Sequence, residues 1–284
     1  MFVFSFVLVQ IHTAMSDREG KIKIMFANYH MHTWRCKHAE GTEREYVERA
    51  IEGGLKILGF SDHTPYLFPR GFDTHTRMEM GQMEDYVTTV LDLKREYRKD
   101  IEIHLGLEVE YYPEYFEKLV RFVEDYPVEY FLLGEHFIDP GPKMIFLGYP
   151  MPKELEMDWL TRYVDLCIEG LQTGRFLYLA HPDLPNFSGD PALYEQEMRR
   201  LCKAMIRYKI PGELNFLGIW KHRNYPCEAF WKIAGEEGVP VVLGTDAHRP
   251  DKVWDPESEK TALKFVEKYG LKLLESLDRV SAYL

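Results

Sequence analysis

The stretch VVLGTDAH, residues 241–248, joins an apolar run to an aspartate and a histidine. A short, uninterrupted apolar run is typical of a strand that is buried on both faces in a parallel sheet. The same order, with a His or Glu at the carboxyl end of the run, recurs in five more stretches: IMFANYHMH (24–32), ILGFSDH (57–63), IHLGLEVE (103–110), YFLLGEH (130–136) and FLYLAH (176–181). This repetition predicts several buried strands with chemically active side chains at their ends.

Helix-like stretches alternate with these strands. They lie at 43–53, 79–98, 115–126, 158–172, 191–208 and 227–238. A further strand is expected at GELNF, 212–216, and two short helices after residue 248. Regular alternation of strands and helices predicts a parallel β/α barrel of about seven strands. In such barrels the active site lies at the carboxyl ends of the strands.

Length and composition indicate one enzyme-sized domain, residues 25–284, since 45% of the chain is hydrophobic. Residues 1–24, which begin with an apolar run of about eleven residues, are interpreted as an extension or loose tail, with a targeting segment or a packed element as alternatives. Their apolar run has no basic residue before it and is too short to span a bilayer.

Charge and cysteine usage limit the partners. A formal net charge of -11, without a Lys/Arg-rich segment interleaved with aromatics, argues against nucleic-acid binding. No membrane partner is expected. The four cysteines show no C-x-x-C spacing, which indicates reduced thiols and a cytoplasmic protein. The oligomeric state stays open.

Nine residues of metal-binding type lie at or near the predicted strand ends: His30, His32, His38, His63, Glu108, His136, His181, Asp246 and His248. Residues i and i+2 of a strand point to the same side, so His30 and His32 can chelate one ion, as can Asp246 and His248. His38 is expected in the loop after the first strand. Imidazole with carboxylate suits zinc, iron or manganese better than magnesium or calcium. We therefore expect two or three divalent ions that attract an anionic substrate.

At these residues the chain resembles the PHP (polymerase and histidinol phosphatase) family, within it the monofunctional histidinol-phosphate phosphatases. The resemblance runs from about Asn28 to the region after His248, through H-x-H-T, F-S-D-H, G-L-E-V-E-Y, G-E-H-F, A-H-P-D and G-T-D-A-H. It implies a distorted (β/α)7 barrel and a trinuclear site. The implied ligand sets are His30, His32, Glu108 and Asp246; Glu108, His136 and His181; and His38, His63 and His248.

The resemblance implies a phosphomonoesterase that hydrolyses L-histidinol phosphate to L-histidinol and phosphate. Glu108 can place one oxygen on each of two ions, which supports a bridging hydroxide poised for in-line attack on phosphorus. Glu108 and Asp246 are thus expected to be catalytic. Asp183 is a candidate acid for the leaving alkoxide, or else a partner that orients a ligand imidazole. Glu110, on the same strand face as Glu108, is expected beside a ligand or at the rim.

Four basic residues are candidates to hold the phosphate, with a solvated surface role as the alternative for each: Arg77, Lys221, His222 and Arg223. Phe216 and Leu217 depart from the pattern usual in the histidinol-phosphatase branch, so a PHP phosphoesterase acting on another small phosphate ester is an alternative. An amidohydrolase-type metal hydrolase is a second, although it does not explain His38 and His63. A metal-stabilised scaffold without activity is a third, but it would be expected to have lost ligands.

Overall fold

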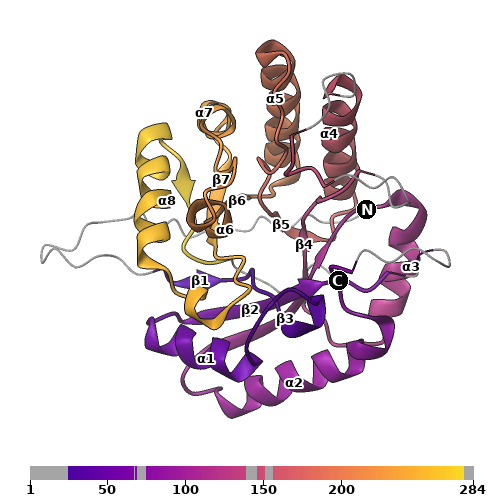
Figure 1. Ribbon diagram of the computed structural model, residues 1–284, viewed down its shortest axis with the longest axis vertical. Coiled ribbons are helices and arrows are strands. Elements are labelled where there is room, and N and C mark those ends of the chain that lie inside the picture. The colour runs from indigo at the N-terminus through magenta and orange to yellow at the C-terminus, as the bar shows by residue number, and fades with distance from the viewer. Residues whose placement is uncertain (1–24, 67, 69–74, 139–145, 151–155, 278–284) are drawn as a thin grey trace, which may run out of the picture.

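A curled parallel sheet forms the centre of the molecule (Figure 1). The computed structural model describes residues 25–66, 68, 75–138, 146–150 and 156–277. The strands follow one another in chain order, each parallel to its neighbours. They are β1 (Ala27–Asn28), β2 (Ile57–His63), β3 (Glu102–Val109), β4 (Tyr130–Leu133), β5 (Phe176–Leu179), β6 (Gly212–Asn215), β7 (Pro240–Gly244) and β8 (Lys272–Leu273).

The first and seventh strands meet at their carboxyl ends. Met31 forms an isolated parallel bridge with Ala247, and the backbone N–H of His32 donates to the Ala247 carbonyl at 2.9 Å. This contact joins the ends that carry the predicted ligands. The predicted seven-strand PHP-type barrel is confirmed, with β8 as an additional short strand beside β7.

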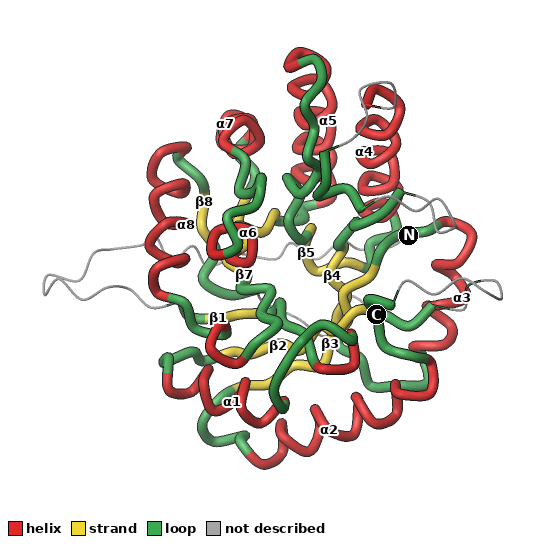
Figure 2. Tube along the Cα trace, viewed as in Figure 1, coloured by secondary structure: helices red, strands yellow, loops and turns green. Residues whose placement is uncertain are grey.

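Helices cover the outside of the sheet (Figure 2). Their bounds are α1 (Glu43–Glu52), α2 (Met83–Glu96), α3 (Pro113–Val123), α4 (Glu156–Gln172), α5 (Pro191–Tyr208), α6 (Phe216–Trp220), α7 (Glu228–Glu237) and α8 (Pro256–Tyr269), with 3-10 turns η1 (Trp34–Cys36), η2 (Met80–Gln82) and η4 (Pro250–Lys252). The predicted helices recur with shifts at their ends. Among the described residues, no helix is long and apolar enough to cross a membrane.

Two elements differ from the expectation, and the hydrogen bonds of an asparagine side chain explain each difference. The strand predicted over 24–32 is only two residues long, because Asn28 Oδ1 accepts from the backbone N–H groups of His30 and Thr245 in place of a regular ladder. The strand predicted over 212–216 ends at Asn215, whose side chain accepts from Gly218 N and caps the unpredicted α6. The predicted extension at 1–24 lies outside the described residues, so that domain boundary stays a prediction.

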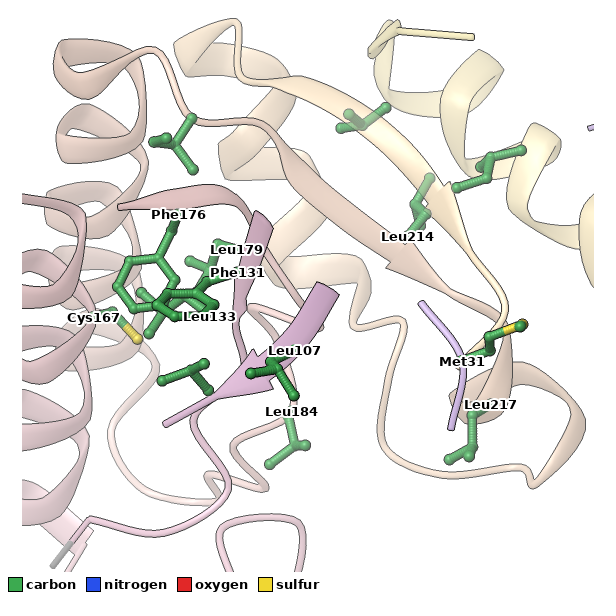
Figure 3. Packing of buried hydrophobic residues seen from close by; sticks show 14 of the residues in the cluster. Met31, Leu107, Phe131, Leu133, Cys167, Phe176, Leu179, Leu184, Leu214 and Leu217 are labelled. Carbon is green, nitrogen blue, oxygen red and sulfur yellow. The ribbon is translucent and has the colours of Figure 1, made fainter. Parts of the chain in front are cut away.

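Alternating side chains along the strands separate two cores. Figure 3 shows Phe131, Leu133, Phe176 and Leu179 packed together beside Cys167 of α4, on the helix-covered side of the sheet. Residues next to them in sequence point the other way, because successive strand side chains alternate between faces.

The inner side of the barrel is filled by a layer that includes Tyr29, Tyr130 and Tyr178. The Tyr130 hydroxyl donates to the carbonyls of Tyr29 (2.8 Å) and Phe60 (3.1 Å). Gly106 makes room for this ring, since a Cβ there would lie 2.3 Å from it. The interior of the barrel below the carboxyl ends of the strands is therefore filled by packed side chains.

A partly buried ion cluster connects α2 to the sheet. Glu129 lies 2.6 Å from Lys94 Nζ, 2.8 Å from His104 Nδ1 and 3.1 Å from the backbone N of Leu105. Burial alone would raise the pKa of Glu129, but the hydrogen bonds from His104, Lys94 and Leu105 lower it to about 2.

Because the pKa of Glu129 is depressed in the folded state, its stabilisation is present above the unfolded value and disappears as pH falls from about 4.5 toward 2. We predict that Glu129→Gln lowers the free energy of unfolding at pH 7 by about 1–2 kcal/mol. Urea titrations should show this gap narrowing below pH 4.5. The control is Glu102→Gln, which removes a carboxylate with a 61% exposed side chain from the same histidine. An equal loss in both variants would contradict the prediction.

Candidate metal centre

The structure brings all nine predicted ligands together at the carboxyl ends of the strands. Their donor atoms form overlapping groups of three, within which all atoms lie within 4.8 Å of one another: His30, His32 and Glu108; His30, His181 and Asp246; His63, Glu108 and His136; and His38, His63 and His248. A further group joins Cys36 to His32 and His248.

Glu108 of β3 lies at the centre of this arrangement and is 2% exposed. Five imidazoles have a ring nitrogen within 3.6 Å of its carboxylate. Oε1 faces His181 (2.9 Å), His30 (3.4 Å) and His136 (3.6 Å), and Oε2 faces His63 (2.9 Å) and His32 (3.5 Å). Because each oxygen faces a different set of imidazoles, the carboxylate can bridge two ions.

Several buried polar atoms of the cluster lack a hydrogen-bond partner among the residues that the structure describes. They are Nε2 of His30, both ring nitrogens of His32, Oε2 of Glu108 and Nδ1 of His181. Unpartnered buried polar groups are strongly unfavourable and rare in folded proteins. Cations bound between these atoms would remove that penalty, so the residues present fit divalent metal ions.

His38 and His248 give a second sign of a cation. Each uses Nδ1 on a backbone carbonyl, that of Cys36 at 2.7 Å and that of Asp246 at 3.0 Å. Their Nε2 atoms then face each other at 2.9 Å. When both Nδ1 atoms are donors, both neutral rings present a lone pair at Nε2, and these repel unless a cation lies between them.

The electrostatic environment divides the histidines into two sets. Burial, together with the charge of His32, lowers the pKa of His63 and His248 well below its usual value, so both stay neutral as metal ligation requires. Burial would also lower the pKa of His32, but the carboxylates of Asp246 and Asp62, 3.1 and 3.6 Å from its ring nitrogens, raise it to about 9. His32 thus lies where the surrounding carboxylates favour positive charge.

Asp246 adds to that negative field. Burial opposes its charge, but His30 and His32 hold the pKa of the Asp246 carboxyl well below its usual range. Together with Glu108, whose pKa is also held well below its usual range, it gives the centre two ionised carboxylates among the imidazoles. This donor set is the one expected for divalent metal ions, so the cluster fits a divalent metal site.

Arg77, predicted to hold phosphate, lies behind His136. Its guanidinium is 5% exposed and donates to both oxygens of Glu110, at 2.6 and 3.1 Å. Glu110 Oε1 lies 3.2 Å from His136 Nδ1, which places Glu110 beside a ligand, as expected. The Arg77 guanidinium is therefore paired with Glu110, and Glu110 in turn contacts His136. The contacts of Arg77 place it behind a candidate ligand, and its role in holding phosphate stays a prediction.

Asp183 lies in the loop after β5 and is 1% exposed. Its Oδ2 accepts from the backbone N–H of Cys227 (2.6 Å) and from Trp231 Nε1 (2.8 Å). Burial raises the pKa of Asp183 to about 7. These contacts connect the loop that carries His181 to α7, which favours a positioning role for Asp183 over that of acid.

Lys221, His222 and Arg223 are all exposed and follow α6. Lys221 Nζ lies 4.9 Å from the centre of the Trp220 ring. The Arg223 guanidinium carbon lies 5.9 Å from the centre of the Phe146 ring, which in turn stacks on the His136 ring at 6.3 Å. Of the three residues predicted to contact phosphate, Arg223 is therefore connected to the ring of a candidate ligand, His136, through the ring of Phe146.

One buried carboxylate next to the ligands was missed by the sequence analysis. Glu213 of β6 is fully buried, with Oε1 2.8 Å from His30 Nδ1. A glutamate inside the apolar strand GELNF was the available signal, because a buried charge needs a partner.

Gly134, after β4, is required by Glu108. A Cβ at Gly134 would lie 2.1 Å from Glu108 Oε1, and the five surrounding imidazoles leave the carboxylate little freedom to move away. We predict that Gly134→Ala lowers the zinc bound per chain and weakens zinc affinity at least tenfold, measured by elemental analysis and titration. Gly81→Ala, where nothing lies within 4 Å of the added Cβ, is the control. Undiminished zinc binding by Gly134→Ala would contradict the prediction.

Comparisons with known proteins agree with the fold. The PHP domain family model matches residues 28–216, more than half of the chain. A probable histidinol-phosphatase of Deinococcus radiodurans is 29% identical over 240 residues, covering 79% of this chain and 86% of that protein. One from Schizosaccharomyces pombe is 26% identical over 275 residues, covering 88% and 89%.

Among solved structures, the histidinol phosphate phosphatase of Lactococcus lactis, complexed with zinc, L-histidinol and phosphate, has a similar fold. It gives a TM-score of 0.68 at 19% identity and covers 90% of this chain and all of that one. The family match and the residues gathered around Glu108 lead to one conclusion: the chain belongs to the PHP domain family.

Proposed function

We propose that the chain is a metal-dependent phosphomonoesterase that hydrolyses L-histidinol phosphate to L-histidinol and phosphate. The observation that carries the proposal is the bridging position of Glu108 among five imidazoles, with the other predicted ligands around it. Membership of the PHP family and relatives named as histidinol-phosphatases support the substrate.

The proposed centre holds two or three ions of zinc, iron or manganese. The proposed ligand sets are His30, His32, Glu108 and Asp246 for one ion, Glu108, His136 and His181 for a second, and His38, His63 and His248 for a third. One group of donor atoms contains the third set whole, and another contains His30, His32 and Glu108 of the first. Support for the second set is that Glu108 Oε1 lies 2.9 Å from His181 and 3.6 Å from His136. When bound, such ions supply positive charge to the phosphate oxygens and lower the pKa of the water that attacks phosphorus.

The protein's own groups hold and orient the reactants. Glu108 and Asp246 are the catalytic carboxylates of the proposal, because their oxygens lie 3.5 and 3.1 Å from His32 Nε2 and would hold an ion together with it. Arg223 is proposed to hold the phosphate from the side of Phe146, since guanidinium pairs well with phosphate oxygens. We assign Asp183 to positioning, because its Oδ2 already accepts two hydrogen bonds.

The substrate is proposed to be a small ester in the cytoplasm, not nucleic acid. Support comes from the formal net charge of -11 and from four free cysteines. The departures from the branch pattern at Phe216 and Leu217 do not favour another ester, because both side chains are buried in the apolar core, at 1% and 6% exposure. The amidohydrolase alternative leaves the group of His38, His63 and His248 without a role.

The direct test is phosphate release from L-histidinol phosphate, measured beside a panel of small phosphate monoesters with metal-quantified protein. We expect selective turnover of histidinol phosphate. In His136→Ala we expect kcat/KM to decrease at least a hundredfold, because that variant loses one of the ligands proposed for the second ion. Turnover of other esters alone would refute the substrate. Metal-loaded protein without any phosphatase activity would refute the proposed reaction.

Arg223 and Lys221 offer a matched pair for the phosphate contact. We expect Arg223→Gln to raise KM about tenfold with a smaller change in kcat, since about 1.4 kcal/mol of charged contact is lost. Lys221→Gln should change KM less than twofold, because its ammonium lies over Trp220. A larger increase of KM in Lys221→Gln than in Arg223→Gln would contradict the prediction, since it would place the phosphate beside Lys221.

A further inference from the structure

Glu213 contacts both the buried layer inside the barrel, through Tyr178, and the candidate metal centre, through His30. It lies on β6 with its carboxylate fully buried, and it faces away from Leu214, which packs in the apolar core (Figure 3). Oε1 lies 2.8 Å from His30 Nδ1 and accepts from the Tyr178 hydroxyl at 3.1 Å. Tyr178 belongs to the layer of residues that fills the interior below the site.

The other oxygen holds two more parts of the site. Oε2 accepts from the backbone N–H of His181 at 3.1 Å and from Asn215 Nδ2 at 2.9 Å. The same Asn215 nitrogen lies 3.2 Å from Asp246 Oδ2. One carboxylate therefore accepts four hydrogen bonds and reaches, directly or through Asn215, three proposed ligands.

These contacts determine the ring tautomer of one candidate ligand and the backbone conformations of two others. Donation from His30 Nδ1 leaves the lone pair on Nε2, the atom that faces Glu108 without a hydrogen-bond partner among the described residues. His181 has φ of 30° and Asp246 has φ of 48°, values that non-glycine residues rarely adopt. The hydrogen bonds to His181 N and, through Asn215, to the Asp246 carboxylate help to retain these conformations.

The neighbouring strand leaves room for this carboxylate. A Cβ at Gly244 of β7 would lie 1.7 Å from Glu213 Oε1, so only glycine fits beside it. The pairing of Asn215 with Gly244 keeps the two strands in this register.

We propose that Glu213 is a positioning residue of the metal centre, which sets the tautomer of His30, the backbone of His181 and the orientation of Asp246. The inference rests on the proposed function only in taking these three residues as metal ligands. It adds a residue that does not touch the ions but determines how tightly they are held.

The test is Glu213→Gln, which preserves volume but replaces an acceptor oxygen by an NH2 group that faces donors. We expect zinc affinity to fall 10- to 100-fold, measured by titration and elemental analysis. In ¹⁵N-labelled protein the ring-nitrogen signals of His30 should lose the single Nδ1–H tautomer. The matched control is Glu197→Gln on α5, which changes an equally buried glutamate (4% exposed) paired with Arg200, and it should leave both readouts unchanged.

Unchanged zinc affinity and an unchanged His30 tautomer in Glu213→Gln would overturn the proposal, as would an equal loss in Glu197→Gln. If Glu213→Gln does not fold, Tyr178→Phe provides the test, since it removes one donor from Oε1. A several-fold weaker zinc affinity supports the proposal, and wild-type affinity overturns it. Both readouts are independent of turnover, so failure of the phosphatase assay with these results intact would refute the proposed function and not this inference.

Discussion

The burial of the Glu108 carboxylate among five imidazoles is the constraint on which the rest of the structure depends. A carboxylate that is 2% exposed needs compensating positive charge, and burial holds one of its imidazole neighbours, His63, neutral. The surrounding carboxylates instead raise the pKa of three neighbours, His30, His32 and His136. Asp246 adds a second buried negative charge beside them. Divalent ions satisfy the carboxylates and the unpartnered ring nitrogens at the same time.

The fold serves this requirement by bringing strand ends to one place. Six of the eight parallel strands, β1 to β5 and β7, carry the candidate ligands at or just after their carboxyl ends. The bridge between Met31 and Ala247 joins the first of these residues to the last. Glycines create the space that the carboxylates occupy. Gly134 lies against Glu108, and Gly244 lies against Glu213. Packing and site chemistry are therefore coupled at the same backbone positions.

The sequence predicted the barrel and the gathering of the nine candidate ligands because both follow from local periodicity. Strand-like runs end at the ligand residues, and parallel strands place their ends on one face. The interactions that orient the candidate ligands could not be predicted from the sequence in the same way. Glu213 contacts residues at 30 and 181, and Arg77 reaches Glu110, and such distant pairings have no periodic signature. The α6 helix was missed because Asn215 ends a strand and caps a helix at once.

The most direct test of the account is the anomalous scattering of crystals at the zinc, iron and manganese edges. The account predicts two or three peaks, with two of them on either side of the Glu108 carboxylate, each about 2.0–2.2 Å from a carboxylate oxygen and from imidazole nitrogens of the cluster. Peaks confined to other parts of the molecule, or ions that do not contact Glu108, would contradict it.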